Sequence, residues 1–560
     1  MDRSKTIALL FVCYGLVAFF RLMAPSDIDV RDQAKQGLYV LDVVQKGSFF
    51  LPTERGSKPA TKPPLYNWVA AVVSLAWGKV TDLTIKLPAV LSGLGVVLVT
   101  FLVSEMLFSK EVGLFAGLVL ILNYHFTNLS CTARTDMMLC LFISLSLYLF
   151  LLAYRKHGEK SIYTTLIFVS MGLGSITKGP VAFLVPIIVI LGFLFFMKDV
   201  KWLKSMQLGW GITIWLVIML GWFVPALIEG GRQFFDIVIY DEMVNRFLGI
   251  GTRAEKTRPF YYLVGHFFGK FLPWSLFVPS AMLSYWKSKN RTEKYGLLFP
   301  MIWFLSVLIF FSLSGGKRSD HILPLYPAAS VIVGQFWFSL VERDKPDHWT
   351  SHLRTLSLGY LLGCFFVAMG LLILWTKPGL VQAVARLVLR SPEKIKLLED
   401  SVRTRTYLPM LTALPLAITS ILGVAFALKK NVKALFIALS ITALFSLSTY
   451  FEILSPEAIM RSGEQKKTFC LKAAEKIDSF ENLTFSNIVQ NSVLFYMGKN
   501  IRSLNQDEAL EFFRSTDNPY MITTEVEYLA LRRSSNLEFI VLEKSEYLIS
   551  EKEKYVLIGR

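Results

Sequence analysis

Long apolar stretches are the feature that most constrains this chain. Residues 162–197 contain a single charged side chain, Lys178, and residues 6–23 also contain only one, Arg21. A helix of about 20 apolar residues crosses the ~30 Å hydrocarbon core of a bilayer. Only 18% of the 560 residues are charged, against roughly 25% in soluble domains. The chain is therefore expected to be an α-helical, polytopic membrane protein.

The lengths of the apolar runs predict about thirteen spans. Lysine and arginine gather in every second short connection, so the positive-inside rule places the N-terminus in the cytoplasm. An odd number of spans then places the C-terminus on the outer side. The expected spans are residues 6–24, 84–107, 112–129, 136–154, 162–176, 178–197, 208–228, 263–285, 296–313, 319–340, 355–376, 408–428 and 433–451.

Two domains are expected. The first, residues 1–451, is transmembrane and has long outer loops at 25–83, 229–262 and 377–407, and the second, residues 452–560, is a small soluble α/β domain on the outer side. Alternating polar and apolar residues in this tail predict short strands and one helix. The strands are expected at 483–489, 520–523, 539–542 and 555–558, and the helix at 507–513.

The charge balance and the cysteines exclude other classes of protein. The net charge of +17 is largely explained by the cytoplasmic connections, and no basic stripe with interleaved aromatic residues indicates nucleic-acid binding. The five cysteines are far apart and lack metal-ligand or redox spacing, so they predict neither a zinc site nor a disulfide framework. No cofactor is expected, and a divalent metal is not indicated.

The first outer loop carries the most information about function. Residues 34–44 have apolar side chains at helical spacing and predict an amphipathic helix at the membrane surface. Residues 66–77 are apolar but too few to span, so they predict an interfacial or re-entrant helix. Pro63 and Pro64 suit a first helical turn, which places Lys62 just before a helix N-terminus. This position favours a phosphate, although an interfacial lysine that reaches toward water is the alternative.

Charged residues at the ends of later spans are further candidates. Asp136 begins an otherwise apolar span, where a carboxylate must be paired, face a wet cavity or simply complement the helix dipole. Arg134, two residues earlier, is expected to point elsewhere. Lys178 lies alone between two apolar spans, so it is either a functional residue or a charge that only marks the end of a span. Gly179 and Pro180 predict a tight break with exposed N–H groups that suit an anion.

Two more groups extend this set on the outer side. Lys317 follows a glycine pair, and His321 either contacts substrate or has a structural role. Glu242 and Arg246 are four residues apart on one helical face, where a solvated ion pair is the simple alternative. Several bases around a few carboxylates indicate an anionic, lipid-borne substrate, with a phosphate as the expected group. Because ATP and nucleotide sugars are cytoplasmic in ordinary cells, a preassembled lipid-linked donor is expected instead of a nucleotide donor.

Short motifs in a fixed order resemble one family of membrane enzymes. They are Asp32-Gln33 with Gly37; Lys62-Pro63-Pro64-Leu65; Thr135-Asp136; Thr177-Lys178-Gly179; Arg246-Phe247; Pro259-Phe260-Tyr261-Tyr262; Leu272-Pro273-Trp274; and Gly316-Lys317 through Ile322-Leu323-Pro324. Their order is similar to that of the polyprenyl-phosphate-sugar-dependent transferases. These include the bacterial lipid A aminoarabinose transferases and, more distantly, the protein O-mannosyltransferases.

The resemblance implies a GT-C fold and transfer of a sugar from a polyprenyl phosphate, such as undecaprenyl phosphate. It implies catalytic roles for Asp32 and Asp136. Carrier-phosphate binding is expected from Lys35, Lys62 and Lys178. Substrate contacts are expected from Glu242, Arg246, Lys317 and His321.

Gln33 and Thr61 depart from the family, which has acids at both positions. The sugar is therefore left open between 4-amino-4-deoxy-L-arabinose and another pentose or hexose, and the acceptor between lipid A and another cell-surface molecule. A monomer in the bacterial inner membrane is expected to work on its outer face. Protein glycosylation of the O-mannosyltransferase type is one alternative. A multi-pass transporter is another, although the related halves common in transporters are not visible.

Overall fold

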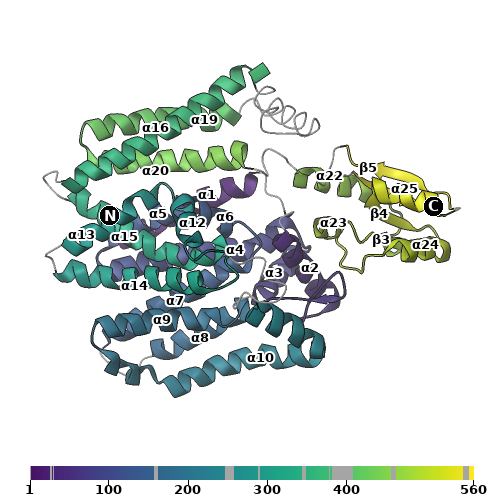
Figure 1. Ribbon diagram of the computed structural model, residues 1–560, viewed down its shortest axis with the longest axis horizontal. Helices are drawn as coiled ribbons and strands as arrows, with labels where there is room; N and C mark the ends of the chain where they lie inside the picture. Colours follow the sequence, from purple (N-terminus) through teal and green to yellow (C-terminus); the bar gives the residue numbers. More distant parts are fainter. Residues whose placement is uncertain are drawn as a thin grey trace.

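A bundle of apolar helices and a small α/β domain make up the molecule (Figure 1). The computed structural model describes residues 2–24, 28, 31–156, 162–245, 258–287, 291–342, 348–377, 379–380, 408–455, 462–535, 537–546 and 554–560. Within these ranges, nine helical segments are long and apolar enough to cross a membrane, and a bent pair makes ten. The predicted fold class is confirmed, whereas the count of thirteen spans is not.

The nine segments occupy expected positions and form most of the bundle. They are α1 (Arg3–Met23), α4 (Asp82–Leu107), α7 (Thr135–Arg155), α10 (Leu208–Phe234) with η2 (Phe235–Asn245), α14 (Arg291–Leu313), η5 (Ser319–Leu325) with α15 (Tyr326–Glu342), α16 (His348–Thr376), α19 (Leu408–Leu428), and α20 (Val432–Thr449) with η6 (Tyr450–Leu454). Two shorter helices, α8 (Ile162–Lys178) and α9 (Val181–Phe196), lie where two further spans were expected, and the 3₁₀ helix η1 (Val200–Met206) follows them.

Two expected spans are broken. Residues 112–129 form α5 (Lys110–Ile121) and α6 (Tyr124–Ser130), which meet at 74°. The Asn123 side chain accepts a hydrogen bond from the Phe126 N–H at 2.8 Å and so caps α6 at the bend. Residues 263–285 are divided into α12 (Tyr262–Lys270), η4 (Trp274–Phe277) and α13 (Val278–Lys287). Pro273 lies between the first two, and a proline cannot continue a helical hydrogen-bond pattern.

The first outer loop forms two helices, as expected, and a hairpin between them. The helices are α2 (Arg31–Lys46) and α3 (Leu65–Trp77), and the hairpin pairs β1 (Thr53–Glu54) with β2 (Lys58–Pro59). The expectation that the first helix lies at the membrane surface stays a prediction, and residues 36–43 of this helix are all buried within the protein. Helix α2 packs against α3 and against the C-terminal domain, so protein covers its apolar side chains.

The C-terminal domain is built on a four-stranded sheet in the order β3-β4-β6-β5. Strands β3 (Leu483–Phe485) and β4 (Tyr520–Thr524) are parallel, whereas β5 (Ile540–Lys544) and β6 (Tyr555–Gly559) join antiparallel. The strands predicted at 520–523, 539–542 and 555–558 are confirmed, whereas the strand predicted at 483–489 covers only Leu483–Phe485. The predicted helix at 507–513 is α24 (Gln506–Ser515), and α22 (Ser462–Ala474), α23 (Asn491–Tyr496), α25 (Glu525–Ser534) and the short η7 (Phe480–Asn482) complete the domain.

Alternate side chains of this sheet enter two different cores. Ile522 and Leu557 pack with α22, α23 and also α2, whereas Met521 and Val556 pack with α24 and α25. One core of the C-terminal domain is therefore continuous with the first outer loop of the membrane domain.

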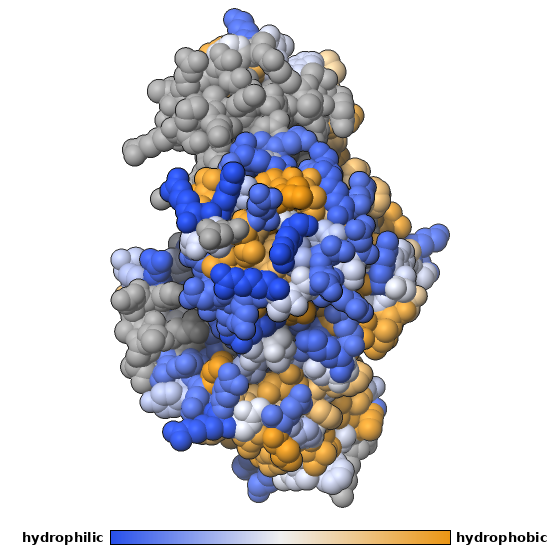
Figure 2. Space-filling model, turned by 90° about the vertical axis from the view of Figure 1, so that its right-hand side faces the viewer, coloured by the Kyte–Doolittle hydropathy of each residue, from blue (hydrophilic) through white to orange (hydrophobic). Residues whose placement is uncertain are grey.

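The molecule is polarised along the helix axes. The C-terminal domain lies beside α2 and α3 at one end of the bundle, and the N-terminus lies at the opposite end (Figure 1). Seen from the end that carries the C-terminal domain, much of the surface is hydrophilic, with apolar patches among the hydrophilic residues of the centre and more apolar surface toward the lower and right-hand margins (Figure 2). The two termini therefore lie at opposite ends of the bundle. That the N-terminus is cytoplasmic and the C-terminus on the outer side stays a prediction.

Candidate functional site

Predicted site residues from distant parts of the sequence meet at the end of the bundle nearest the C-terminal domain. Asp32 lies in the first turn of α2, Asp136 in the first turn of α7, and Lys178 at the last position of α8. Each side chain therefore projects from a helix end, where apolar packing gives way to polar groups. Arg318 and Asp320, at the start of η5, complete the group.

Arg134 joins the three carboxylates. Its guanidinium lies 2.8 Å from Asp320, 3.2 Å from Asp136 and 3.5 Å from Asp32, measured between nitrogen and oxygen atoms. The expectation that Arg134 points away is wrong, because it precedes α7 in an extended conformation and is not fixed to the helical spacing. Burial works against the charge of Arg134, but the three carboxylates outweigh it and raise the pKa of the guanidinium.

Asp136 and Lys178 form a buried ion pair beneath Arg134. The ammonium of Lys178 lies 2.5 Å from one Asp136 oxygen, and Arg134 contacts the other oxygen. A carboxylate at the start of an apolar span is thus paired on both sides, as its burial requires. The Gly179 N–H was expected to be exposed to an anion, but it donates to the Ser175 carbonyl at 2.7 Å. Lys178 itself, rather than a backbone N–H of Gly179, provides the positive group.

Asp32 is the more accessible of the two predicted catalytic carboxylates. Its side chain is 38% exposed, against 5% for Asp136. Arg318 donates to Asp32 at 2.7 Å. Burial opposes ionisation of Asp32, but the charges of Arg318 and Arg134 more than offset it, so its pKa lies below the usual value. Asp32 is therefore held as a carboxylate that solvent or substrate can reach.

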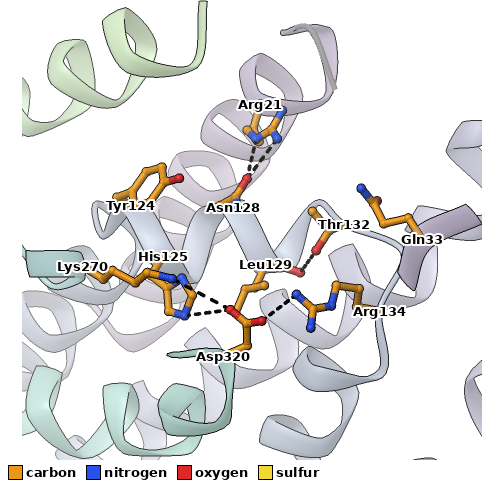
Figure 3. A pocket seen from close by; sticks show the side chains of 10 residues that line it. All are labelled: Arg21, Gln33, Tyr124, His125, Asn128, Leu129, Thr132, Arg134, Lys270 and Asp320. Atoms are coloured by element: carbon orange, nitrogen blue, oxygen red, sulfur yellow. Dashed lines mark hydrogen bonds and ion pairs between the residues drawn. The ribbon is translucent and has the colours of Figure 1, made fainter. Parts of the chain in front are cut away.

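A polar cavity of about 90 Å³ opens beside Arg134 (Figure 3). Asp320 lies at its wall and receives contacts from Arg134, from Lys270 at 3.9 Å and from His125 at 3.7 Å. Burial lowers the pKa of Lys270, with Asp320 opposing this effect. Arg21, on the other side of the cavity, donates to Asn128 at 2.9 Å. The volume is enough for several ordered waters or a small polar group.

Two further ion pairs involve lysines of the first outer loop, one within the loop and one with Glu242 of η2. Lys35 pairs with Glu54 at 2.9 Å, and Lys62 pairs with Glu242 at the same distance. Burial raises the pKa of the Tyr39 phenol, and the nearby charges of Glu54 and Glu242 add to this effect, so the two pairs flank one side chain. Asp32 and Lys35 are three residues apart on α2, which places them on neighbouring positions of one face.

The remaining predicted site residues have mixed outcomes. Lys317 is half-buried, and no described carboxylate forms an ion pair with its ammonium. His321 packs its ring 5.4 Å from that of Phe311, on the element that carries Asp320. Glu242 is brought to Lys62, as described above. Arg246 lies outside the described residues, and so does most of the expected outer loop at 377–407.

Sequence reasoning missed several charged members of the site. Arg318 and Asp320 lie between the predicted residues Lys317 and His321, and this dense run of charged side chains was an available signal. Lys270 gave a weaker one, as the last residue of an amphipathic helix. His125 carried none beyond its residue type. Among the described residues, no cluster of three or more His, Cys, Asp or Glu side chains has an arrangement suited to a metal ion.

Comparison with known proteins adds sequence relatives. Residues 61–224 match the family model described as dolichyl-phosphate-mannose-protein mannosyltransferase. The chain is 24% identical over 375 residues to undecaprenyl phosphate-alpha-4-amino-4-deoxy-L-arabinose arabinosyl transferase 2 of Pseudomonas fluorescens, covering 66% of this chain and 62% of the relative. It is 26% identical over 332 residues to an uncharacterized protein of Aquifex aeolicus, covering 59% and 62%. The chain thus spans less than two thirds of the length of these relatives.

A solved structure resembles the whole chain. ArnT from Cupriavidus metallidurans, crystallised with undecaprenyl phosphate, has a TM-score of 0.73 at 17% identity, and the match covers 99% of this chain and 97% of ArnT. At this identity the likeness shows a shared fold. The family model and the sequence relatives are similar to parts of this chain, and the ArnT structure shares its fold over nearly the whole length.

Proposed function

We propose that this protein is a membrane glycosyltransferase that takes a sugar from a polyprenyl phosphate carrier, with undecaprenyl phosphate as the expected carrier. The observation that carries the proposal is the convergence of Asp32, Asp136 and Lys178 on one charged network. These three residues come from three different helices, α2, α7 and α8, that are far apart in the sequence. A full-length fold match to a protein crystallised with undecaprenyl phosphate supports the choice of carrier.

The chemistry requires a group that stabilises the leaving phosphate. An acceptor oxygen attacks the anomeric carbon of the sugar, the bond from that carbon to the phosphate oxygen breaks, and negative charge remains on the carrier phosphate. Lys35 and Lys62 are suited to bind this phosphate. Each ammonium has three N–H donors and can contact a phosphate oxygen while it keeps its carboxylate partner. Oriented cations of this kind lower the barrier because they meet charge as it develops.

The role of Asp32 depends on the acceptor. If the acceptor is a hydroxyl, its proton must leave, and an ionised, accessible carboxylate such as Asp32 is the natural base. If the acceptor is itself a phosphate, no base is needed, and Asp32 would instead orient Arg318 and Arg134. Both cases need Asp32 in its charged form.

The product is proposed to be a sugar-modified molecule on the outer face of the bacterial inner membrane. Lipid A carrying 4-amino-4-deoxy-L-arabinose is one candidate, because the curated relatives carry that activity in their names. A glycosylated protein is the second, because the family model is described as a protein mannosyltransferase. The protein is proposed to act as a monomer, with its C-terminal domain in the periplasm.

Transfer by the purified full-length chain in liposomes tests the proposal. The liposomes would contain an undecaprenyl-phosphate-linked labelled aminopentose or hexose, with lipid A or a serine-rich peptide as acceptor. Asp32→Asn and Lys62→Ala should each lower the rate by about 10²–10³, the cost of removing one oriented group. Asp82→Asn and Lys472→Ala are matched controls, since both residues form exposed ion pairs away from the site.

Retention of transfer in both site variants would reject the proposed site. Uptake of labelled solute by the same liposomes, without any glycosylated product, would favour a transporter instead. Mass spectrometry of lipid A and surface glycans from cells with and without the gene would identify the product.

A further inference from the structure

The C-terminal domain reaches the proposed donor site through one side chain, Asn491 at the start of α23. The Asn491 Nδ2 donates to Glu54 Oε1 at 2.6 Å. The other oxygen of Glu54, Oε2, pairs with the Lys35 ammonium at 2.9 Å. An amide, a carboxylate and an ammonium thus form a continuous chain of contacts from the C-terminal domain to Lys35.

The orientation of the Asn491 amide is fixed from both sides. Its Oδ1 accepts from the Arg55 Nε at 2.7 Å, while its Nδ2 faces the Glu54 carboxylate. A guanidinium needs an acceptor and a carboxylate needs a donor, so only one of the two amide orientations serves both neighbours. Asn491 can therefore hold Glu54 in one place.

Arg55 attaches the β1–β2 hairpin of the first outer loop to the C-terminal domain. Its guanidinium also donates to the Ser503 hydroxyl at 2.9 Å and to the Val489 carbonyl. The Arg55 backbone has a φ of +54°, a left-handed conformation that is uncommon for a residue with a Cβ. Such strain persists only where surrounding contacts hold it, and here these contacts come from the other domain.

Apolar and backbone contacts make this docking close. The Phe495 ring lies against Gly37, so that a Cβ added to Gly37 would be 2.4 Å from a ring carbon. The Asn500 amide donates to the carbonyls of Leu38 and Thr53, at 3.2 and 2.8 Å. The C-terminal domain thereby holds both α2 and the hairpin, the two elements that carry Lys35 and Glu54.

We propose that Asn491 is a positioning residue that places Lys35 through Glu54, so that the C-terminal domain sets the affinity of the protein for the phosphate of its donor. The inference rests on the proposed function, in which Lys35 binds the carrier phosphate. The Lys35 and Glu54 side chains are 21% and 11% exposed, so neither has much freedom to find another partner. Loss of the Asn491 donor would leave a nearly buried carboxylate free to draw Lys35 out of position.

Kinetics with the sugar donor in charge-altering variants test the contact chain from Asn491 through Glu54 to Lys35. Asn491→Asp keeps the acceptor for Arg55 but places a second carboxylate 2.6 Å from Glu54, and two such groups cannot both ionise. Its KM for the undecaprenyl-phosphate-linked donor should rise about tenfold with kcat less affected, the pattern of lost binding. The double variant Asn491→Asp/Glu54→Gln restores a donor–acceptor pair and should return to within about threefold of the starting KM. Lys472→Ala, an exposed ion-pair change in the same domain, should leave KM unchanged.

A second readout does not depend on activity. Limited amine labelling of the full chain, read by mass spectrometry, should show a changed labelling rate at Lys35 in Asn491→Asp. The rate at Lys544, exposed on the same domain, should stay the same. If wild-type protein transfers no sugar, the proposed function fails, while the labelling experiment still tests the link between Asn491 and Lys35. An unchanged KM together with unchanged Lys35 labelling in folded Asn491→Asp would overturn the inference, and so would a loss of thermal stability without a change at Lys35.

Discussion

Arg134 offers the most direct test of the charged network. The substitution Arg134→Met keeps a long side chain but removes the cation that joins Asp32, Asp136 and Asp320. Asp136 would still have Lys178, and Asp32 would still have Arg318. The expected consequence is a higher pKa for Asp32, because one of its two compensating charges is lost.

The size of this rise follows from the distance between Arg134 and Asp32. Two unit charges 3.5 Å apart interact by about 1 kcal/mol in water and about 5 kcal/mol at an effective dielectric constant of ~20. The Asp32 side chain is 38% exposed, so solvent screening favours the lower half of this range, about 2 kcal/mol. This energy corresponds to a rise of about 1.5 units in the pKa of Asp32.

The pH dependence of kcat/KM measures the shift. If the charged form of Asp32 is required, the acid limb of the profile should move to higher pH by about 1.5 units in Arg134→Met. Arg134→Lys keeps a positive charge and should leave the limb close to that of the unchanged protein, although a single ammonium cannot reach all three carboxylates. An acid limb that stays in place in folded Arg134→Met would refute the assignment of Asp32 as the titrating group.

Three further predictions concern stability. Lys178→Met should destabilise the protein by about 3–5 kcal/mol, because Asp136 stays buried with one partner fewer, and the double variant with Asp136→Leu should melt at a higher temperature than Lys178→Met alone. Burial opposes ionisation of Glu54, but Asn491 and Lys35 outweigh it and lower the pKa of its carboxyl. Its stabilising contribution is therefore complete above the ordinary carboxyl pKa of ~4.3 and is lost as the pH falls through the lower folded value. Amide protection factors in residues 53–59, which correct for the pH dependence of intrinsic exchange, should be high at pH 5 and lower near pH 3. Finally, Gly37→Ala should weaken docking of the C-terminal domain by about 1–3 kcal/mol through its clash with Phe495, as faster proteolysis would show, and Phe495→Ala in the same chain should relieve the clash.

The sequence determined the fold class of the protein and pointed to several charged residues of its candidate site. Apolar runs require helices in a bilayer, whatever their partners, because an unpaired backbone in lipid is too costly. Likewise, an ionisable residue such as Asp136 or Lys178 at the end of an apolar span must be paired or solvated. Each is therefore a candidate site residue even when its partner is unknown. The alternating pattern of the tail was enough to locate its four strands, since the period of a strand is local.

Only the tertiary structure decided which charges meet. Arg134 contacts Asp136 because it lies just before α7, which begins at Thr135, and has an extended backbone. Sequence patterns cannot locate the start of a helix to within one residue. Arg318 reaches Asp32 across 286 positions of sequence, through helix packing that no local pattern encodes. Helix α2 was expected at a membrane surface, and the structure covers its apolar side chains with the C-terminal domain. An amphipathic face requires an apolar partner, but only the fold decides which partner it meets.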